Sequence, residues 1–148
     1  MPDPAPVNPF GVRFGVPAEV AFDYLVDPHR RPEWQSSLRR VEDVDPGAPR
    51  VGQRWVDVTV PGLRPRMQTT RLDRPDRWSE TGTWRGFDAV LTLTFEPVPD
   101  GCEVAVEMRL TGRGPARPLA AVLNVLSPRA VRADLTRASR LLSPPTDW

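Results

Sequence analysis

Hydrophobic residues recur at two different spacings along the chain. Close to the N-terminus they occupy every second position, at Phe10, Val12, Phe14 and Val16, which is the spacing of a strand with one buried face. Pro17 ends this strand and is placed to start a helix, in which Val20, Phe22, Tyr24 and Leu25 follow at helical spacing. Asp27 is a suitable cap for a second short helix over His29–Ser37. This part of the chain therefore predicts one strand followed by two short helices.

From Leu38 to Thr111 the spacing is two almost throughout, and clusters of glycine and proline interrupt it. These interruptions divide the segment into about six strands. The two most regular strands alternate polar residues with the apolar residues Leu91, Leu93, Phe95, Val104, Val106, Met108 and Leu110. The short join between them at Val98–Gly101 predicts a hairpin. Strands joined by such turns are antiparallel neighbours, because parallel pairs need long crossover connections.

The last segment returns to helical spacing in two apolar stripes. The first consists of Leu119, Val122, Leu123 and Leu126, and the second of Val131, Leu135, Ala138 and Leu142. Pro128 lies between the stripes and lacks a backbone donor, so we expect it to kink or break the helix there. Off the second stripe lie Arg129, Arg132, Arg137 and Arg140. These arginines predict a solvated, basic outer face of the helix.

Together these elements predict an α+β domain. A curved antiparallel sheet of about seven strands buries its apolar face and the helical stripes only by wrapping around the long, kinked C-terminal helix. The chain has 148 residues, a length that suits one domain. We expect that domain to span residues 10–142, with an N-terminal tail at 1–9 and a C-terminal tail at 143–148.

Several short motifs then follow one another in a recognisable order. The run Val16–Leu25 precedes Asp27-Pro28 and Pro32-Glu33-Trp34. The series continues with Val51-Gly52, Thr70-Arg71-Leu72-Asp73-Arg74-Pro75, Phe95-Glu96-Pro97 and Asp100-Gly101. In these motifs the chain resembles the START-like (SRPBCC) superfamily, specifically its polyketide cyclase/dehydrase and lipid-transport branch. The resemblance implies a helix-grip fold with a hydrophobic cavity between the sheet and the long helix.

Composition argues against several other classes of site. The 20 basic residues are all arginine and face 19 acidic ones, for a net charge of +1, which does not favour nucleic-acid binding. Cys102 is the only cysteine and His29 the only histidine, which argues against a disulfide, a Cys or His metal site and a histidine-based triad. We expect no metal, no cofactor and no stable membrane insertion. We expect a cytoplasmic protein that is a monomer or homodimer.

Tryptophan is the residue type that points most clearly to a ligand site, with five in the chain. Indole rings suit a pocket wall because they are large and carry one polar N–H group. We expect the following residues to contact the ligand: Trp34, Trp55, Gln68, Trp84, Phe87, Met108 and Leu123. For the aromatic residues, ordinary core packing is the alternative.

Polar residues on otherwise apolar strand faces are the catalytic candidates, because a buried charge is costly unless a partner or ligand compensates it. The strand face that contains Leu72 also contains Arg66 and Gln68 by simple alternation. In the same way, the face that contains Trp78 also contains Glu80. We therefore name Arg66 and Glu80 as the candidate catalytic residues.

The strand register leaves alternatives open. Met67 and Thr69 compete for the inward face, and a slip of one residue exchanges the two faces of a strand. Asp57 is a weaker candidate, since its neighbours Val56, Val58 and Val60 have the spacing of a buried set.

The functional hypothesis is a protein that binds a hydrophobic or aromatic small molecule in an internal cavity. In a polyketide cyclase/dehydrase-like reaction, Arg66 would polarise a carbonyl or enolate oxygen, and Glu80 would move protons during aldol cyclisation or dehydration. A non-catalytic carrier of lipids or other small molecules is the alternative, and a protein-binding regulator is a third interpretation. Whether the protein is an enzyme stays open at this point.

Overall fold

The structure is a computed structural model that describes residues 10–143, apart from the side chains of residues 121, 122 and 124–126. Seven strands form one antiparallel sheet: β1 (Phe10–Phe14), β2 (Leu38–Glu42), β3 (Arg54–Thr59), β4 (Arg66–Asp73), β5 (Arg77–Trp84), β6 (Phe87–Val98) and β7 (Gly101–Gly112). The helices are α1 (Ala18–Leu25), α2 (Arg31–Trp34) and α3 (Arg117–Leu142), with single 3-10 turns at Pro28–Arg30 and Gly114–Ala116. The predicted α+β class and seven-stranded sheet are confirmed.

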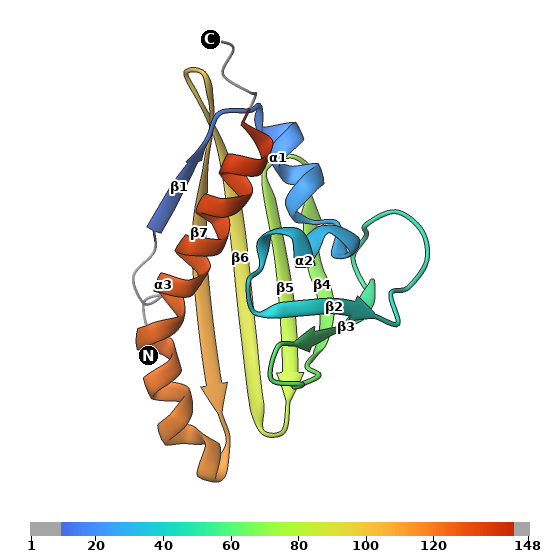
Figure 1. The fold of residues 1–148 in the computed structure, drawn as a ribbon, viewed down its shortest axis with the longest axis vertical. Coiled ribbons are helices and arrows are strands. Elements are labelled where there is room, and N and C mark those ends of the chain that lie inside the picture. Colours follow the sequence, from blue (N-terminus) through green and yellow to red (C-terminus); the bar gives the residue numbers. More distant parts are fainter. Residues whose placement is uncertain (1–9, 144–148) are drawn as a thin grey trace.

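The strand order explains how the sheet encloses a space. The order is β1-β7-β6-β5-β4-β3-β2, so β1 joins the sheet beside the last strand and the others follow as hairpin neighbours. Val98 pairs with Gly101 at the predicted hairpin. Figure 1 shows β2 and β3 running across the long strands, so that this end of the sheet curls towards the helices.

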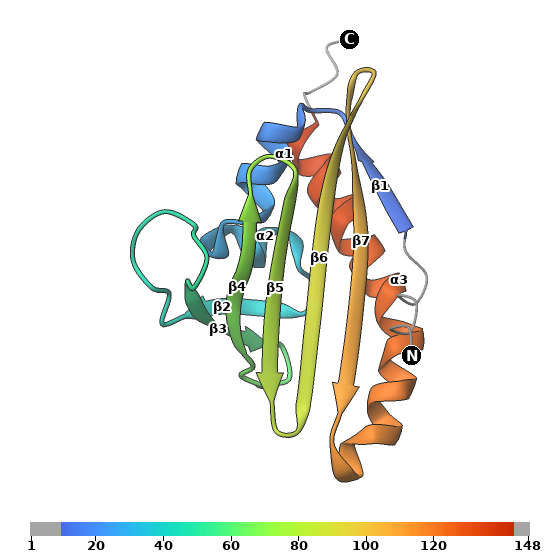
Figure 2. The same cartoon turned by 180° about the vertical axis from the view of Figure 1, so that it is seen from behind.

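All three helices cover one face of the sheet, and the view from behind leaves the opposite face uncovered (Figure 2). The side chain of Asp27 accepts a hydrogen bond from the backbone of His29 at 3.0 Å, which confirms it as a cap. The second helix is shorter than the predicted span to Ser37, because Gln35 already has extended backbone angles. None of the described helices combines the length and apolar composition that a membrane crossing requires.

The long helix α3 continues through Pro128 without a break. In its predicted second stripe, Leu135 and Ala138 are buried, and Val131 and Leu142 are partly buried against the core. Leu119 of the first stripe is 52% exposed, which corrects the prediction for that residue. Ala120 takes the inward position instead and is buried. It packs so closely against Gly112 of β7 that a Cβ atom added there would lie 3.0 Å from the Cβ of Ala120. The side chains of Val122 and Leu126 lie outside the described part of the structure. Of the two predicted tails, only Ser143 is described.

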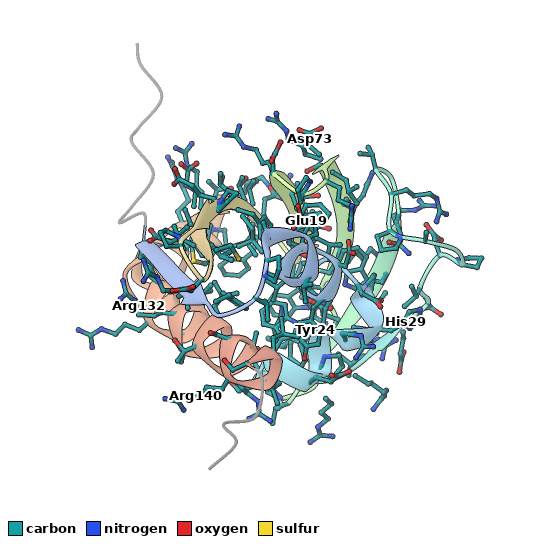
Figure 3. All side chains as sticks on the ribbon, turned by 90° about the horizontal axis from the view of Figure 1, so that it is seen from above. Glu19, Tyr24, His29, Asp73, Arg132 and Arg140 are labelled. Carbon is teal, nitrogen blue, oxygen red and sulfur yellow. The ribbon has the colours of Figure 1, made fainter. Side chains whose placement is uncertain are left out.

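The basic outer face of α3 is partly used for packing. Arg132 lies over the ring of Phe10, with 4.8 Å between the guanidinium carbon and the ring centroid. Arg137 donates to the backbone carbonyl of Glu33 at 3.0 Å. Arg132 and Arg140 lie on the side of α3 that points away from the interior (Figure 3). Two of the four predicted arginines therefore hold neighbouring elements in place.

Candidate functional site

A cavity of about 270 Å³ lies between the inner face of the sheet and the helices α2 and α3. Most of its wall is apolar and comes from Trp34 on α2, from Met67, Leu91, Leu93 and Met108 on the sheet, and from Val131 and Leu135 on α3. The charged residues that line it, among those the structure describes, are Arg31, Glu80 and Asp134. Such a wall suits a ligand that is mainly apolar and has few polar groups.

Arg31 connects α2 to two strands through a buried network with Asp57 and Glu80. Its Nη1 atom donates to Oε2 of Glu80 at 2.8 Å, and its Nη2 atom donates to Oε1 at 3.3 Å. A second fork joins Nε and Nη2 to the two carboxylate oxygens of Asp57, at 3.2 and 2.9 Å. The three side chains are between 3% and 6% exposed. Planar forks of this kind fix both position and orientation of the groups they join.

Local structure places each member of this network. On β5, alternation directs Trp78, Glu80 and Gly82 to the same inner face. On β3, Asp57 shares the inner face with Trp55, whose indole Nε1 donates to Asp57 Oδ1 at 2.9 Å. The guanidinium of Arg31 lies over that indole at 5.1 Å from the ring centroid. Trp55 therefore contacts both an acid and the cation of the network.

The network holds two acids for one cation, which controls the protonation of Glu80. The pKa of Glu80 is raised to about 6, because burial, the largest cause, and repulsion from Asp57 together outweigh the opposing charge of Arg31. Burial disfavours the charge of Arg31, but the carboxylates of Glu80 and Asp57 outweigh it and hold the pKa of Arg31 above its ordinary value. Glu80 is thus a cavity carboxyl group that changes charge near neutral pH, as general acid–base chemistry requires.

Three residues predicted from the sequence reach this region. Glu80, Trp34 and Met108 line the cavity. Trp55 is fully buried but supports Asp57 and Arg31 from behind. His29 is exposed at the periphery (Figure 3), where no part of the cavity lies.

The predicted inward direction of Arg66 and Gln68 is wrong. Both are exposed, whereas Thr69 is buried and Met67 lines the cavity. The reason is a bulge in β4: Thr69 pairs with Glu80, but the next pair joins Arg71 to Ser79. The extra residue lets Leu72 and Thr69 both face inward, so counting back from Leu72 by twos gives the wrong face.

Three further predicted contacts lie away from the cavity wall. Trp84 and Phe87 stack on each other at the β5–β6 turn, with ring centroids 6.0 Å apart. Leu123 is half-buried on α3. None of the three is among the described residues that line the cavity.

Arg31 and Asp57 are the site residues that sequence reasoning missed or ranked too low. Val58 is buried like Asp57, so both faces of β3 are covered there and alternation does not identify the inner one. Val60, which supported the competing pattern, is 49% exposed. The sequence contains one indication that Asp57 faces inward, because Trp55 lies two positions before it and therefore on the same strand face. A buried indole N–H group usually has a hydrogen-bond acceptor close by.

Comparison with known protein families gives one match to nearly the whole chain. Residues 12–142 match the model of the family described as polyketide cyclase / dehydrase and lipid transport. The chain belongs to that family. No protein of curated function matches the chain. Within the described residues, this family member has no group of three or more acidic, histidine or cysteine side chains placed to hold a metal ion.

Solved structures show that this family member has the START-like helix-grip fold, as the sequence implied. A START superfamily protein from Mycobacterium smegmatis is similar with a TM-score of 0.71 at 12% identity, over 92% of this chain and 98% of that one. The di-domain ARO/CYC StfQ from the steffimycin biosynthetic pathway gives 0.73 at 15% identity, over 90% of this chain and 49% of that one. A Deinococcus radiodurans protein gives 0.59 at 24% identity, over 89% and 93%.

Proposed function

We propose that this polyketide cyclase/dehydrase family member binds a small, largely apolar molecule in its cavity and transfers protons on it through Glu80. The observation that carries the proposal is the position of Glu80, a buried carboxyl group with a pKa of about 6 at the wall of an apolar cavity. A group with a pKa near the working pH is an effective acid and base in turn.

The reaction that fits this arrangement is dehydration of a β-hydroxy carbonyl compound. The Glu80 carboxylate removes a proton from the carbon next to the carbonyl group, and the electron pair forms the new double bond as the β-hydroxyl group leaves. Protonated Glu80 returns its proton to that hydroxyl, so that water is released and the carboxylate is restored. Aldol cyclisation uses the same first step, with the proton returned to the new alkoxide.

Arg31 is a positioning residue in this proposal. Each of its three guanidinium nitrogens donates to a protein acceptor, so it orients Glu80 and stabilises its charged form. Arg66 takes no part, because it is exposed on the outer face of the sheet.

The test uses the aldol of acetone and benzaldehyde as a probe, because its dehydration gives a conjugated ketone that absorbs strongly. We expect the wild-type protein to dehydrate it roughly 100-fold faster than Glu80→Gln, which keeps the shape but not the base. Glu107→Gln is the matched control, since Glu107 is exposed on β7. Equal rates for the wild-type protein and Glu80→Gln, with both folded, would contradict the catalytic proposal.

A non-catalytic carrier is the second candidate, and the apolar wall of Met67, Leu91, Met108 and Leu135 favours it. A carrier would bind the same molecules without converting them. Native mass spectrometry before and after incubation separates the two functions, because it detects bound substrate and bound product by mass.

A further inference from the structure

We propose that the cavity selects an uncharged ligand of one or two rings that donates a hydroxyl hydrogen bond to Glu80, and that it rejects carboxylates. This inference rests on the proposed function, because it names the class of molecule that the same cavity binds. It follows from the charges, the hydrogen-bond acceptors and the volume of the site.

The charges around the cavity are unbalanced. Arg31 is the one cation among its described lining residues, whereas Glu80 and Asp134 are acids, and Asp57 lies directly behind Arg31. Arg31 is already shared between the two buried carboxylates. A ligand carboxylate would enter a site with an excess of negative charge and would lose its water in an apolar space. Both effects oppose its binding.

Beside Arg31, the wall presents the carboxylate oxygens of Glu80, which are acceptors. A carboxylate has about four lone-pair positions, and the contacts from Arg31 use two of those on Glu80, at 2.8 and 3.3 Å. Arg31 directs each of its three nitrogens to Asp57 or Glu80, and among its described contacts only the second N–H of Nη1 is left for a ligand acceptor. Asp134 is similarly an acceptor, from the backbone and hydroxyl of Ser36 at 3.2 and 2.9 Å. A ligand donor is therefore complementary to Glu80, whereas the indole Nε1 of Trp34, which is buried without a partner in the described structure, is a donor on the same wall.

The volume limits the size of the ligand. The cavity holds about 270 Å³, whereas one water molecule occupies roughly 30 Å³ of liquid. At protein-like packing this space takes a molecule of on the order of ten non-hydrogen atoms. One or two fused rings fit this space, and a larger ring system would extend beyond it.

Three naphthalenes with different groups at the same position separate the effects of hydrogen-bond donation, negative charge and apolar contact on affinity. Naphthol is the donor, naphthoate the anion and methylnaphthalene the apolar reference. Affinities are measured at neutral pH by calorimetry, with tryptophan fluorescence as a second signal because Trp34 lines the cavity. We expect naphthol to bind about tenfold or more tightly than methylnaphthalene. Naphthoate should bind more weakly than methylnaphthalene.

Glu80→Gln is the informative variant. It should reduce the preference for naphthol and raise the affinity for naphthoate, whereas the exposed Glu107→Gln control should change neither. Should Glu80→Gln fail to fold, the order of the three ligands on the wild-type protein is the test by itself. Naphthoate binding as tightly as naphthol would overturn the inference and leave the proposed function intact. No binding of any of the three would overturn the proposed function, and with it the inference.

Discussion

Arg31 and Glu80 are 49 positions apart in the chain, yet Nη1 of Arg31 and Oε2 of Glu80 lie 2.8 Å apart in a buried ion pair. The pair joins a four-residue helix to a central strand of the sheet. Because Asp57 shares the same guanidinium, Arg31 stabilises two buried carboxylates at once.

Arg31→Met leaves Asp57 and Glu80 buried without their partner. We expect it to lower the free energy of unfolding by about 3–5 kcal/mol at neutral pH. Urea denaturation measures the change. Arg30→Met is the matched control, since Arg30 is exposed and its contacts with Glu33 and the ring of Tyr24 are at the surface, so its effect should be below about 1 kcal/mol. Similar losses for the two variants would contradict the importance assigned to the buried network.

Glu80 should make stability depend on pH in a defined direction. Its pKa is raised from 4.5 to about 6 in the folded protein, so the folded state binds this proton more tightly than the unfolded chain. Between those pH values the unfolded chain holds fewer protons, and stability therefore falls as the pH rises. The contribution of Glu80 should become less favourable by about 2 kcal/mol across the window.

This dependence is isolated by subtracting the unfolding free energies of Glu80→Gln from those of the wild-type protein at each pH. The stabilising contribution of Glu80 should have its full value below its unfolded pKa of 4.5. It should be lost as the pH rises through its folded pKa of about 6. A difference that stays constant, or that grows with pH, would show that Glu80 has no raised pKa.

Asp57→Asn tests the electrostatic coupling between the two acids. Asp57 contributes to the raised pKa of Glu80 by repulsion and also shares Arg31 with it. Removing that charge leaves the guanidinium to Glu80 alone, so we expect the pKa of Glu80 to fall below about 6. A carbon-detected NMR titration of the Glu80 carboxyl group measures the change. An unchanged or higher pKa would contradict the described coupling.

Gly82 controls the space available to Met67. A Cβ at Gly82 would lie 2.8 Å from Sδ and 3.1 Å from Cε of Met67, so Gly82→Ala forces that flexible side chain to move. Since both residues line the cavity, we expect weaker naphthol binding with only a small loss of stability.

Two further variants give this prediction its controls. Gly15→Ala should leave binding unchanged, because its added Cβ meets only the hydroxyl of Ser143, at 4.0 Å. Met67→Ala combined with Gly82→Ala should recover part of the lost affinity. Unaltered binding by Gly82→Ala would mean that the ligand occupies another place.

The regular parts of the chain were predictable from its sequence, and the irregular part of β4 was not. Unbroken alternation between Trp78 and Trp84 on β5 directs Glu80 inward, as predicted. On β4 the bulge between Thr69 and Arg71 breaks the period of two, and no residue type marks it in the sequence. Arg66 was therefore assigned to the wrong face.

Arg31 was beyond the reach of pattern reasoning for a different reason. It lies next to Arg30 at the start of a short helix, where a charged residue is ordinarily solvated. Its burial depends on the sheet curling until β3 and β5 meet α2, which brings together residues 26 and 49 positions away. Local spacing contains no information about such contacts.

A crystal structure of the wild-type protein with naphthol is the most direct test of the proposed site, because ligand binding and the role of Glu80 both depend on where the hydroxyl group lies. We predict the rings between Met67, Met108 and Leu135, with the hydroxyl oxygen within hydrogen-bond distance of a Glu80 carboxylate oxygen. Naphthol bound outside this cavity, or inside it with its hydroxyl directed away from Glu80, would contradict the proposed role of Glu80.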